Sequence, residues 1–449
     1  MTSRPIDLGI FKSYDIRGTY PAELDERVAE MIGRAFVDHV GPSTVAVGRD
    51  MRESSKPLFE AFARGVMMQG VDVVDLGLTS TDELYFAVGN FDYPAGAMIT
   101  ASHNPKQYNG FKLCREGAIA LSAETGVYAI RDIVARREFK PAGRRGAMTA
   151  RDVMPDFVEH CLSFIDLDTI RPLRIAIDCG NGMGGLIVPA IFKRLPVEVI
   201  PLYFELDGSF PNHPASPIEP ENMADLQRAV RESKADLGAA FDGDADRVFI
   251  TDEHGELVGG DMVTALVADM LLRSHPGATI LYNLICSRGV PELISKRGGV
   301  GVRTRVGHSI IKAVMRERDA VFGGEHSGHF YFRDHYFADS GLIALLVVLE
   351  LISRENKPVS ELLAPLDRRF RSGEINSRVV DVPKKLEELV AAYSDGEIDR
   401  LDGVTIQYPQ WWFNVRPSNT EPLLRLNVEA DSRELLENKR DEVLKIIRV

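Results

Sequence analysis

Cysteine is scarce in this chain of 449 residues: only four are present, and no two of them form a CxxC pair. Their wide spacing excludes a disulfide framework and a zinc knuckle, and it suits a reducing cytosol. A secretory signal is also lacking, because the first residues contain no long apolar segment. The most apolar stretch, LIALLVVLELI at 342–352, carries Glu350 and is too short to span a bilayer, so it predicts a buried core helix. We therefore expect a cytoplasmic protein without a membrane partner.

A surplus of basic residues is absent as well. Lys and Arg number 53 against 66 Asp and Glu, which gives a formal net charge of −13. This balance argues against nucleic acid or an anionic membrane as a partner, although a local basic pocket for a small anion can exist within an acidic surface. Hydrophobic residues make up 45% of the chain and charged residues 27%, close to globular averages, so several buried cores are expected.

Short apolar or β-branched runs alternate with helix-length amphipathic segments over most of the chain. The segments 43–50, 56–70 and 71–77 predict a strand, a helix and a second strand in succession. Further strands are predicted within 173–182, 235–247 and 278–287. Such alternation is typical of βαβ units with mainly parallel sheets, in which functional residues gather on loops beyond the strands' carboxyl ends.

The residues from 368 onward follow a different pattern, in which short strands combine with two charged helices, one of them around 384–393. This pattern predicts a smaller α+β domain at the C-terminal end. The expected fold class is therefore α/β, with three α/β domains followed by the smaller one. The expected domains are 1–150, 151–253, 254–367 and 368–449.

Three aspartates, Asp242, Asp244 and Asp246, follow the apolar run LGAAF. At alternate positions of an extended segment their carboxylates point to one side, as oxygen ligands of a hard divalent cation do. A solvated acidic turn would give the same string, but a calcium EF-hand is rejected because Arg247 stands where that loop requires glycine. Three carboxylates leave room for a phosphate oxygen, which favours Mg²⁺, and Arg247 could grip the same phosphate.

Ser102 lies in TASHNP (100–105), directly after the apolar strand AGAMI, where its hydroxyl can face a cleft. His103 is its neighbour, and Lys112 follows ten residues later. Adjacent Ser and His do not make an acyl-transfer triad, which requires spatial proximity, and no G-x-S-x-G elbow is present. Taken alone, such a serine is more often a turn residue than a nucleophile.

Two further loops are rich in ligand-binding groups. RPSNTEP (416–422) offers a guanidinium, two hydroxyls and an amide between prolines, so it is either an anion-binding loop or a plain polar turn. In GGEHSGH (323–329), Glu325 and Ser327 can both face a polyol, although a surface loop can have the same sequence. His308 could take part in proton transfer, but an isolated histidine is more often structural.

Taken together, these strings resemble the α-D-phosphohexomutase family, in particular its phosphomannomutase/phosphoglucomutase branch. The matching segments follow the family order over nearly the whole chain and are YDIRG (14–18), TASHNP (100–105), DGDADR (242–247), VGH (306–308), GEHSGH (324–329) and RPSNTEP (416–422). The resemblance implies three α/β domains of related topology and a smaller fourth domain around a central cleft. It also implies an enzyme that acts on small-molecule hexose phosphates, as a monomer or a homodimer.

The resemblance further implies a mechanism with two phosphoryl transfers. Ser102 is carried as phosphoserine, and Mg²⁺ is held by its phosphate with Asp242, Asp244 and Asp246. The phosphoserine phosphorylates a hexose phosphate to give a hexose 1,6-bisphosphate, which is both intermediate and activator. This intermediate reorients in the closed cleft and returns its other phosphate to Ser102.

The same resemblance implies roles for the remaining site residues. Arg247 and Lys112 lie beside the reacting phosphoryl group, and His308 is expected to contribute to catalysis. Glu325 and Ser327 bind the sugar hydroxyls. The other expected substrate-binding residues are Arg416, Ser418, Asn419 and Thr420 at the distal phosphate, and Tyr14, Arg17, His103 and His329 facing the cleft.

Two positions bear on the substrate and on alternatives. Phosphoglucosamine mutases usually carry Gln where His326 stands, so GEHSGH favours mannose or glucose phosphate. Arg288 stands near a lysine position of some bacterial relatives, and either replaces that lysine or leaves its contact unmade. The alternative functions are a phosphoglucosamine mutase, a metal-dependent sugar phosphatase with Ser102 or Asp242 as nucleophile, and a non-catalytic sugar-phosphate-binding regulator.

Overall fold

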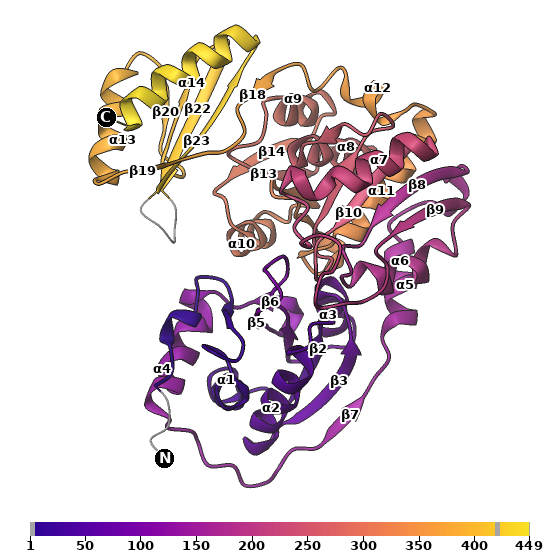
Figure 1. Cartoon of the computed structure of the whole chain (residues 1–449), viewed down its shortest axis with the longest axis vertical. Helices are drawn as coiled ribbons and strands as arrows, with labels where there is room; N and C mark the ends of the chain where they lie inside the picture. The colour runs from indigo at the N-terminus through magenta and orange to yellow at the C-terminus, as the bar shows by residue number, and fades with distance from the viewer. Residues whose placement is uncertain (1–4, 418–422, 449) are drawn as a thin grey trace.

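Four β-sheets follow one another along the chain, each packed with helices (Figure 1). The computed structural model describes residues 5–417 and 423–448, except for the side chains of residues 308 and 309. We call each sheet with its helices a unit and number the units one to four in chain order. The expected α/β class, with three related units and a smaller last one, is confirmed.

The first unit packs helices on both faces of its sheet. Its elements are β1 (Ile16–Thr19), α1 (Glu26–Val40), β2 (Thr44–Arg49), α2 (Ser55–Met68), β3 (Asp72–Leu78), α3 (Thr81–Asn90), β4 (Ala95–Ile99), β5 (Tyr108–Arg115), β6 (Ile119–Ala120), α4 (Tyr128–Arg136) and β7 (Met148–Ala150). The strand order is β1-β5-β4-β2-β3-β7, and β6 pairs with β5. Successive strand residues face opposite sides, so Val45 and Val47 pack with α1, α2 and α4, whereas Ala46 packs with α3.

The second and third units have five-stranded sheets. The second contains α5 (Met154–Leu162), β8 (Leu173–Asp178), α6 (Gly184–Phe192), β9 (Val197–Leu202), α7 (Ala224–Ser233), β10 (Leu237–Phe241), β11 (Val248–Thr251) and β12 (Leu257–Val258). The third contains α8 (Gly260–Ser274), β13 (Thr279–Asn283), α9 (Gly289–Lys296), β14 (Val300–Thr304), α10 (His308–Arg318), β15 (Phe322–Gly324), β16 (Phe330–Phe332), β17 (Ala338–Asp339), α11 (Gly341–Glu355) and α12 (Val359–Leu363). β12 lies beyond residue 253, the expected end of the second domain, yet pairs with β11.

One strand order recurs in these three units. The orders are β3-β2-β4-β5, β9-β8-β10-β11 and β14-β13-β15-β16, with the first three strands parallel and the last antiparallel. The sheets are therefore mixed rather than mainly parallel as the alternation predicted. The difference arises because the fourth strand returns directly through a short loop, a hairpin that the alternating pattern does not reveal.

The second and third units share a continuous apolar core. The segment 342–352 lies within α11, and its buried side chains pack in the same cluster as those of β8, β10 and α8. The buried core helix expected there is confirmed. Within the described residues, no helix is both long and apolar enough to cross a bilayer.

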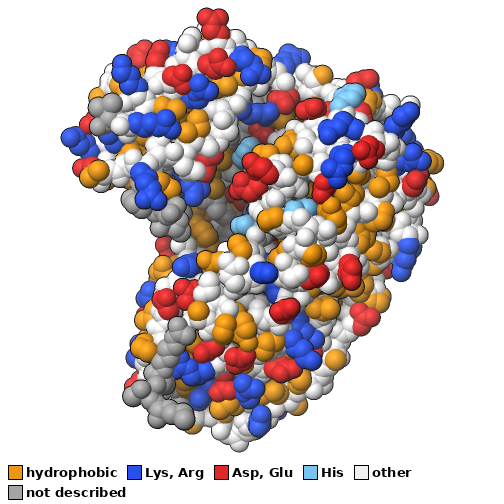
Figure 2. All heavy atoms as spheres, viewed as in Figure 1, with side chains coloured by type: hydrophobic (Ala, Val, Ile, Leu, Met, Phe, Trp, Pro, Cys, Tyr) orange, Lys and Arg blue, Asp and Glu red, His pale blue; other side chains and the backbone are white. Residues whose placement is uncertain are grey.

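The fourth unit is an antiparallel sheet with two helices packed against it. Its elements are β18 (Phe370–Arg371), β19 (Ile375–Arg378), α13 (Val382–Ala392), β20 (Glu397–Asp399), β21 (Val404–Gln407), β22 (Trp411–Pro417), β23 (Leu423–Ala430) and α14 (Arg433–Arg448). The strand order is β18-β23-β22-β21-β20, and β19 also pairs with β23. Figure 2 shows the surface deeply hollowed between this unit, at the upper left, and the first unit below it.

Candidate active site

Equivalent hairpin loops of three units converge on one place. The loop after β4 carries Ser102, the loop after β10 carries the three aspartates, and the loop after β15 carries Glu325 and His329. Together with residues near the N-terminus, they line a cavity of about 250 Å³. Among the sequence-predicted site residues, the cavity lining contains Tyr14, Arg17, Ser102, His103, Lys112, Asp246, Arg247 and His329.

The Ser102 hydroxyl bridges the first and second units. It donates to Oδ2 of Asp242 at 2.8 Å and lies 3.1 Å from Nδ1 of His103. Nη2 of Arg247 donates to the same hydroxyl at 3.3 Å. A Cβ on Gly243 would lie 2.4 Å from the Ser102 carbonyl oxygen, so only glycine permits the two loops to approach this closely. The loop geometry thus joins a hydroxyl, a carboxylate and a guanidinium in a buried contact.

The three aspartates form a buried carboxylate cluster. Asp242, Asp244 and Asp246 each offer an oxygen within 4.8 Å of the others. Oδ1 of Asp244 and Oδ1 of Asp246 are buried and have no hydrogen-bond partner among the described residues. Because buried carboxylate oxygens are costly without a partner, this cluster fits a divalent cation, although the structure does not identify the ion.

Lys112 and Arg247 balance part of this negative charge. The Lys112 ammonium bonds Asp244 at 2.7 Å and also bonds Asp246. Burial alone would lower the pKa of Lys112, but the two carboxylates hold it well above its usual value. Burial would likewise raise the pKa of Asp244, but Lys112 holds it below its usual range. Burial and the neighbouring Asp244 raise the pKa of Asp246 to about 7.

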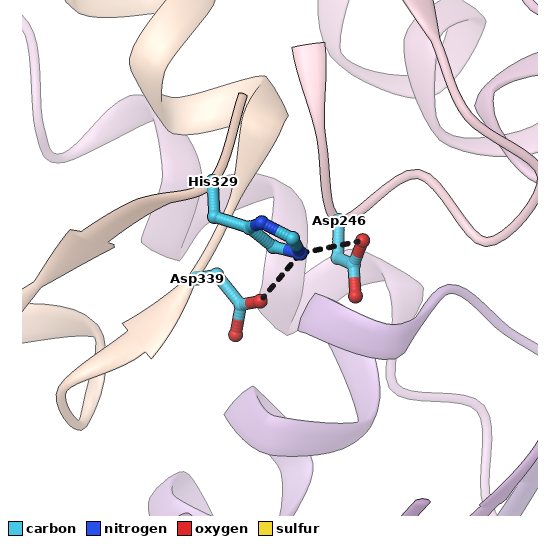
Figure 3. A group of neighbouring side chains, drawn as sticks. All are labelled: Asp246, His329 and Asp339. Carbon is cyan, nitrogen blue, oxygen red and sulfur yellow. Dashed lines mark ion pairs between the residues drawn. The ribbon is translucent and has the colours of Figure 1, made fainter. Parts of the chain in front are cut away.

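A second group of possible metal ligands lies at the same cavity. Figure 3 shows His329 between Asp246 and Asp339, with its Nε2 4.0 Å from an oxygen of each. Burial lowers the pKa of His329 to about 4. Cationic side chains contact the carboxylates of both groups. The three aspartates offer oxygen ligands only, whereas this second group includes an imidazole nitrogen, so we regard the three-aspartate cluster as the better site for a hard divalent cation.

The loop between β15 and β16, which carries Glu325 and Ser327, lies close to this cavity and is held by other contacts. Glu325 is buried and accepts from the Tyr331 hydroxyl at 2.6 Å and from the Gly307 amide at 3.1 Å. The Ser327 hydroxyl is 3.0 Å from Nδ1 of His329. As far as the structure describes the chain, Glu325 and Ser327 do not line the 250 Å³ cavity.

The remaining expected site residues differ in whether they lie at the cavity. Nη1 of Arg17 donates to Oδ1 of Asn104 at 2.6 Å, in the loop of residues 100–107 that carries Ser102, here called the serine loop. Arg416 pairs with Glu374 at 2.6 Å at the end of β22 and is absent from the described cavity lining. Four expected side chains lie outside those that the structure describes: His308, Ser418, Asn419 and Thr420.

Models of one protein family match the chain in four consecutive parts. Three match phosphoglucomutase/phosphomannomutase alpha/beta/alpha domains I, II and III at residues 9–160, 155–255 and 259–369. A fourth matches the C-terminal domain of the same family at residues 374–446. The chain belongs to the phosphoglucomutase/phosphomannomutase family. The family resemblance predicted from the motifs is thereby confirmed.

Whole-chain comparisons give the same result. A phosphomannomutase of Escherichia coli is 39% identical and covers 98% of this chain and 99% of its own length. A Xanthomonas campestris pv. campestris protein named phosphohexose mutases is 40% identical with the same coverage. The crystal structure of a phosphoglucomutase/phosphomannomutase family protein from Burkholderia thailandensis has a TM-score of 0.91 at 34% identity, covering 98% of this chain and 97% of that one. As a member of this family, the chain is an enzyme of the isomerase class.

Arg288 contacts the fourth unit of this family fold rather than the cavity. Its guanidinium donates to the carbonyl oxygens of Tyr408 at 2.8 Å and Pro409 at 3.1 Å. Its amide donates to Glu429 at 3.1 Å. Of the two possibilities that the sequence left open, this geometry favours the one in which the lysine contact is not made.

The motif analysis missed several residues at the site. Lys12, Ser13 and Asp15 line the cavity and could have been found, because they flank or belong to the YDIRG segment. Asp339 also lines it, but no motif marks this aspartate in the sequence. Its place depends on the β16–β17 hairpin, which only the fold reveals.

Thr81 was missed as well, although it supports the carboxylate cluster from the first residue of α3. Its buried hydroxyl donates to Oδ2 of Asp244 at 2.6 Å, and its amide donates to the Asp244 carbonyl at 3.1 Å. The hydroxyl bond fixes Oδ2 of Asp244, whereas its Oδ1 has no hydrogen-bond partner among the described residues. Groups that orient a ligand in this way contribute to metal affinity.

We predict that Thr81→Val weakens Mn²⁺ binding by about 10-fold or more, because the orienting hydroxyl is lost. Electron paramagnetic resonance titration of the purified protein measures this affinity. Thr81→Ser should restore it. Thr264→Val is a matched control, because Thr264 is also buried and donates at 2.7 Å to a backbone carbonyl in α8. Unchanged Mn²⁺ affinity in folded Thr81→Val would contradict this role.

Proposed function

We propose that this chain interconverts hexose 1-phosphates and hexose 6-phosphates, with mannose and glucose phosphates as substrates and Ser102 as the phosphoryl carrier. The observation that supports it most strongly is the contact of the Ser102 hydroxyl with Asp242 and Arg247, at 2.8 Å and 3.3 Å. Phosphoryl transfer depends mainly on positioning and on stabilising negative charge, and these groups supply both. The proposed enzyme works in the cytoplasm as a monomer or a homodimer.

Mg²⁺ is the proposed cation. Asp242, Asp244 and Asp246 would hold it together with the phosphate on Ser102, which suits a cation that prefers oxygen ligands and few protein carboxylates. When bound, Mg²⁺ would neutralise negative charge on the phosphoryl group.

The chain's own cations act on the same group. A phosphate on Ser102 carries a charge of about −1.5 to −2 at neutral pH. Arg247 already donates to the Ser102 hydroxyl, so its planar guanidinium is placed to bond phosphoryl oxygens. Lys112 lines the same cavity and adds a second positive charge. Nδ1 of His103 lies 3.1 Å from the Ser102 hydroxyl oxygen.

The other loops account for substrate binding. Glu325 and Ser327 accept hydrogen bonds from sugar hydroxyls. The carboxylate of Glu325 is held in place by hydrogen bonds from Tyr331 and Gly307. Arg416 with Ser418, Asn419 and Thr420 binds the distal phosphate. Both phosphates of the bisphosphate must be held in turn while the intermediate reorients. The fourth unit therefore closes over the cleft, and this closure also keeps water from the phosphoserine.

We predict that Ser102→Ala abolishes nearly all conversion of mannose 1-phosphate to mannose 6-phosphate, because the phosphoryl carrier is removed. A coupled assay, primed with a trace of mannose 1,6-bisphosphate, measures this rate. The exposed Ser274→Ala serves as the control and should retain wild-type activity. Undiminished activity of Ser102→Ala would overturn the proposal.

The same assay separates the alternative functions. The wild-type enzyme should turn over mannose or glucose 1-phosphate faster than glucosamine 1-phosphate. Glucosamine 1-phosphate as the best substrate would identify a phosphoglucosamine mutase. Inorganic phosphate as the main product would identify a phosphatase, and sugar-phosphate binding without turnover would identify a regulator.

We predict that Glu325→Gln lowers kcat/KM for mannose 1-phosphate by about 10- to 100-fold, since a hydrogen bond to a charged group is worth about 1.5–3 kcal/mol. Steady-state kinetics checks this value. Glu350→Gln is the matched control: Glu350 is equally buried but pairs with Arg354 at 2.8 Å in α11. Equal kcat/KM for Glu325→Gln and Glu350→Gln would remove Glu325 from the substrate site.

A further inference from the structure

Arg52 is a buried arginine behind the loop that carries Ser102. It follows β2, is only 2% exposed and does not belong to the described lining of the active-site cavity. An arginine guanidinium has five N–H donors and cannot be deprotonated in a protein. An arginine buried to this degree therefore needs a partner for each donor.

All five donors of Arg52 have partners. Nε donates to Oδ2 of Asp50 at 3.2 Å. The other four donors bond backbone carbonyl oxygens, with Nη2 reaching Ser102 and Asn104 at 2.7 Å each, and Nη1 reaching Pro105 at 2.9 Å and Tyr108 at 3.1 Å. One side chain thus bonds three carbonyl groups of the loop between β4 and β5 and the carbonyl of Tyr108, the first residue of β5.

The guanidinium is itself held rigidly. Asp50 accepts from the Arg52 amide at 3.0 Å and from the Ser55 hydroxyl, and Asn109 donates to Ser55 at 2.9 Å. On another side, the Arg52 guanidinium lies 5.0 Å from the centre of the Phe210 ring. These contacts fix the position of the Arg52 guanidinium. Its position therefore determines where the carbonyl groups of the serine loop lie.

The serine loop needs such support for a conformational reason. Ser102 has a φ of 51°, in the left-handed region that disfavours residues with a Cβ. Such a conformation persists only where the surroundings determine it fully. The bonds from Arg52 to the carbonyls of Ser102 and Asn104 fix the backbone on both sides of His103. They thereby aim the Ser102 hydroxyl at Asp242 and Arg247.

The loop also needs support for an electrostatic reason. A phosphate on Ser102 would repel carbonyl oxygens that faced it, because both carry negative charge. Four carbonyl oxygens of this segment instead bond Arg52, which lies outside the described cavity lining, so the guanidinium offsets their negative charge.

We infer that Arg52 is the positioning residue of the phosphoryl carrier. It touches neither substrate nor the reacting atoms and acts only through Ser102, so the inference rests on the proposed function. A lysine at this position has three donors on one nitrogen and cannot span four carbonyl oxygens. Arg52→Lys therefore keeps the buried charge but releases part of the loop.

The experiment measures kcat, KM and the rate at which glucose 1,6-bisphosphate phosphorylates Ser102, the last by intact-protein mass spectrometry. Arg52→Lys should lower kcat and the phosphorylation rate by about 10²-fold, as a misplaced reacting group does, with KM changed less than about 2-fold. Arg52→Gln, which also removes the charge, should lose at least as much. Melting temperatures confirm that each variant is folded.

Chemical rescue separates positioning from general support of the fold. Arg52→Ala leaves a space for a guanidinium, so millimolar ethylguanidinium should raise its phosphorylation rate at least several-fold, whereas ethylammonium should not. Arg316→Ala is the matched control, because the Arg316 guanidinium also bonds two carbonyls, those of Gly117 at 3.0 Å and Tyr336 at 2.8 Å, away from the serine loop. Its phosphorylation rate should stay close to wild type, with no effect of ethylguanidinium.

The outcomes distinguish the inference from the proposed function. A wild-type chain that neither becomes phosphorylated on Ser102 nor shows mutase activity would overturn the proposed function and this inference with it. An active wild type with unimpaired Arg52→Lys would overturn the inference alone. So would a loss in Arg52→Ala that ethylguanidinium does not reverse and that only parallels a lower melting temperature.

Discussion

The hydrogen bond from the Ser102 hydroxyl to Asp242 is the contact on which the rest of the site depends. It joins two units whose loops are distant in sequence, and it places a hydroxyl against a carboxylate that is fully buried. Such a carboxylate is tolerated because Arg247 bonds it at 2.9 Å. Gly243 allows the two loops to approach each other. Arg52 bonds the loop that carries Ser102, and Thr81 bonds the loop that carries Asp244. Loss of this contact would separate Ser102 from the carboxylate cluster.

The repeated architecture explains why the loops meet. Each of the first three units places a motif in the hairpin between its third and fourth strands, and in the fourth unit Arg416 and Pro417, the first residues of RPSNTEP, end β22. One topological position, repeated along the chain, therefore supplies Ser102, the carboxylate cluster and Glu325. The continuous core of the second and third units gives this convergence a rigid base.

The sequence predicts those parts of the fold and the site that depend on residues near one another in the chain. Strand β2, helix α2, the core helix α11 and the three motif loops follow from periodicity and from residue types within a few positions. The sequence pattern does not predict the hairpin strands β5, β11 and β16, and it does not give the direction of strand pairing, which an apolar run does not encode. Arg52 was missed because its partners are carbonyl oxygens at least 50 positions away, which have no side-chain signature.

Anomalous diffraction at the manganese edge, from crystals grown with Mn²⁺, tests the central claim most directly. The account predicts one strong peak between the loop that carries Ser102 and the loop that carries the three aspartates. It should lie within about 2.5 Å of oxygens from Asp242, Asp244, Asp246 and Ser102 or its phosphate. A peak held instead by His329 and Asp339, or an ion bound beyond reach of Ser102, would contradict it.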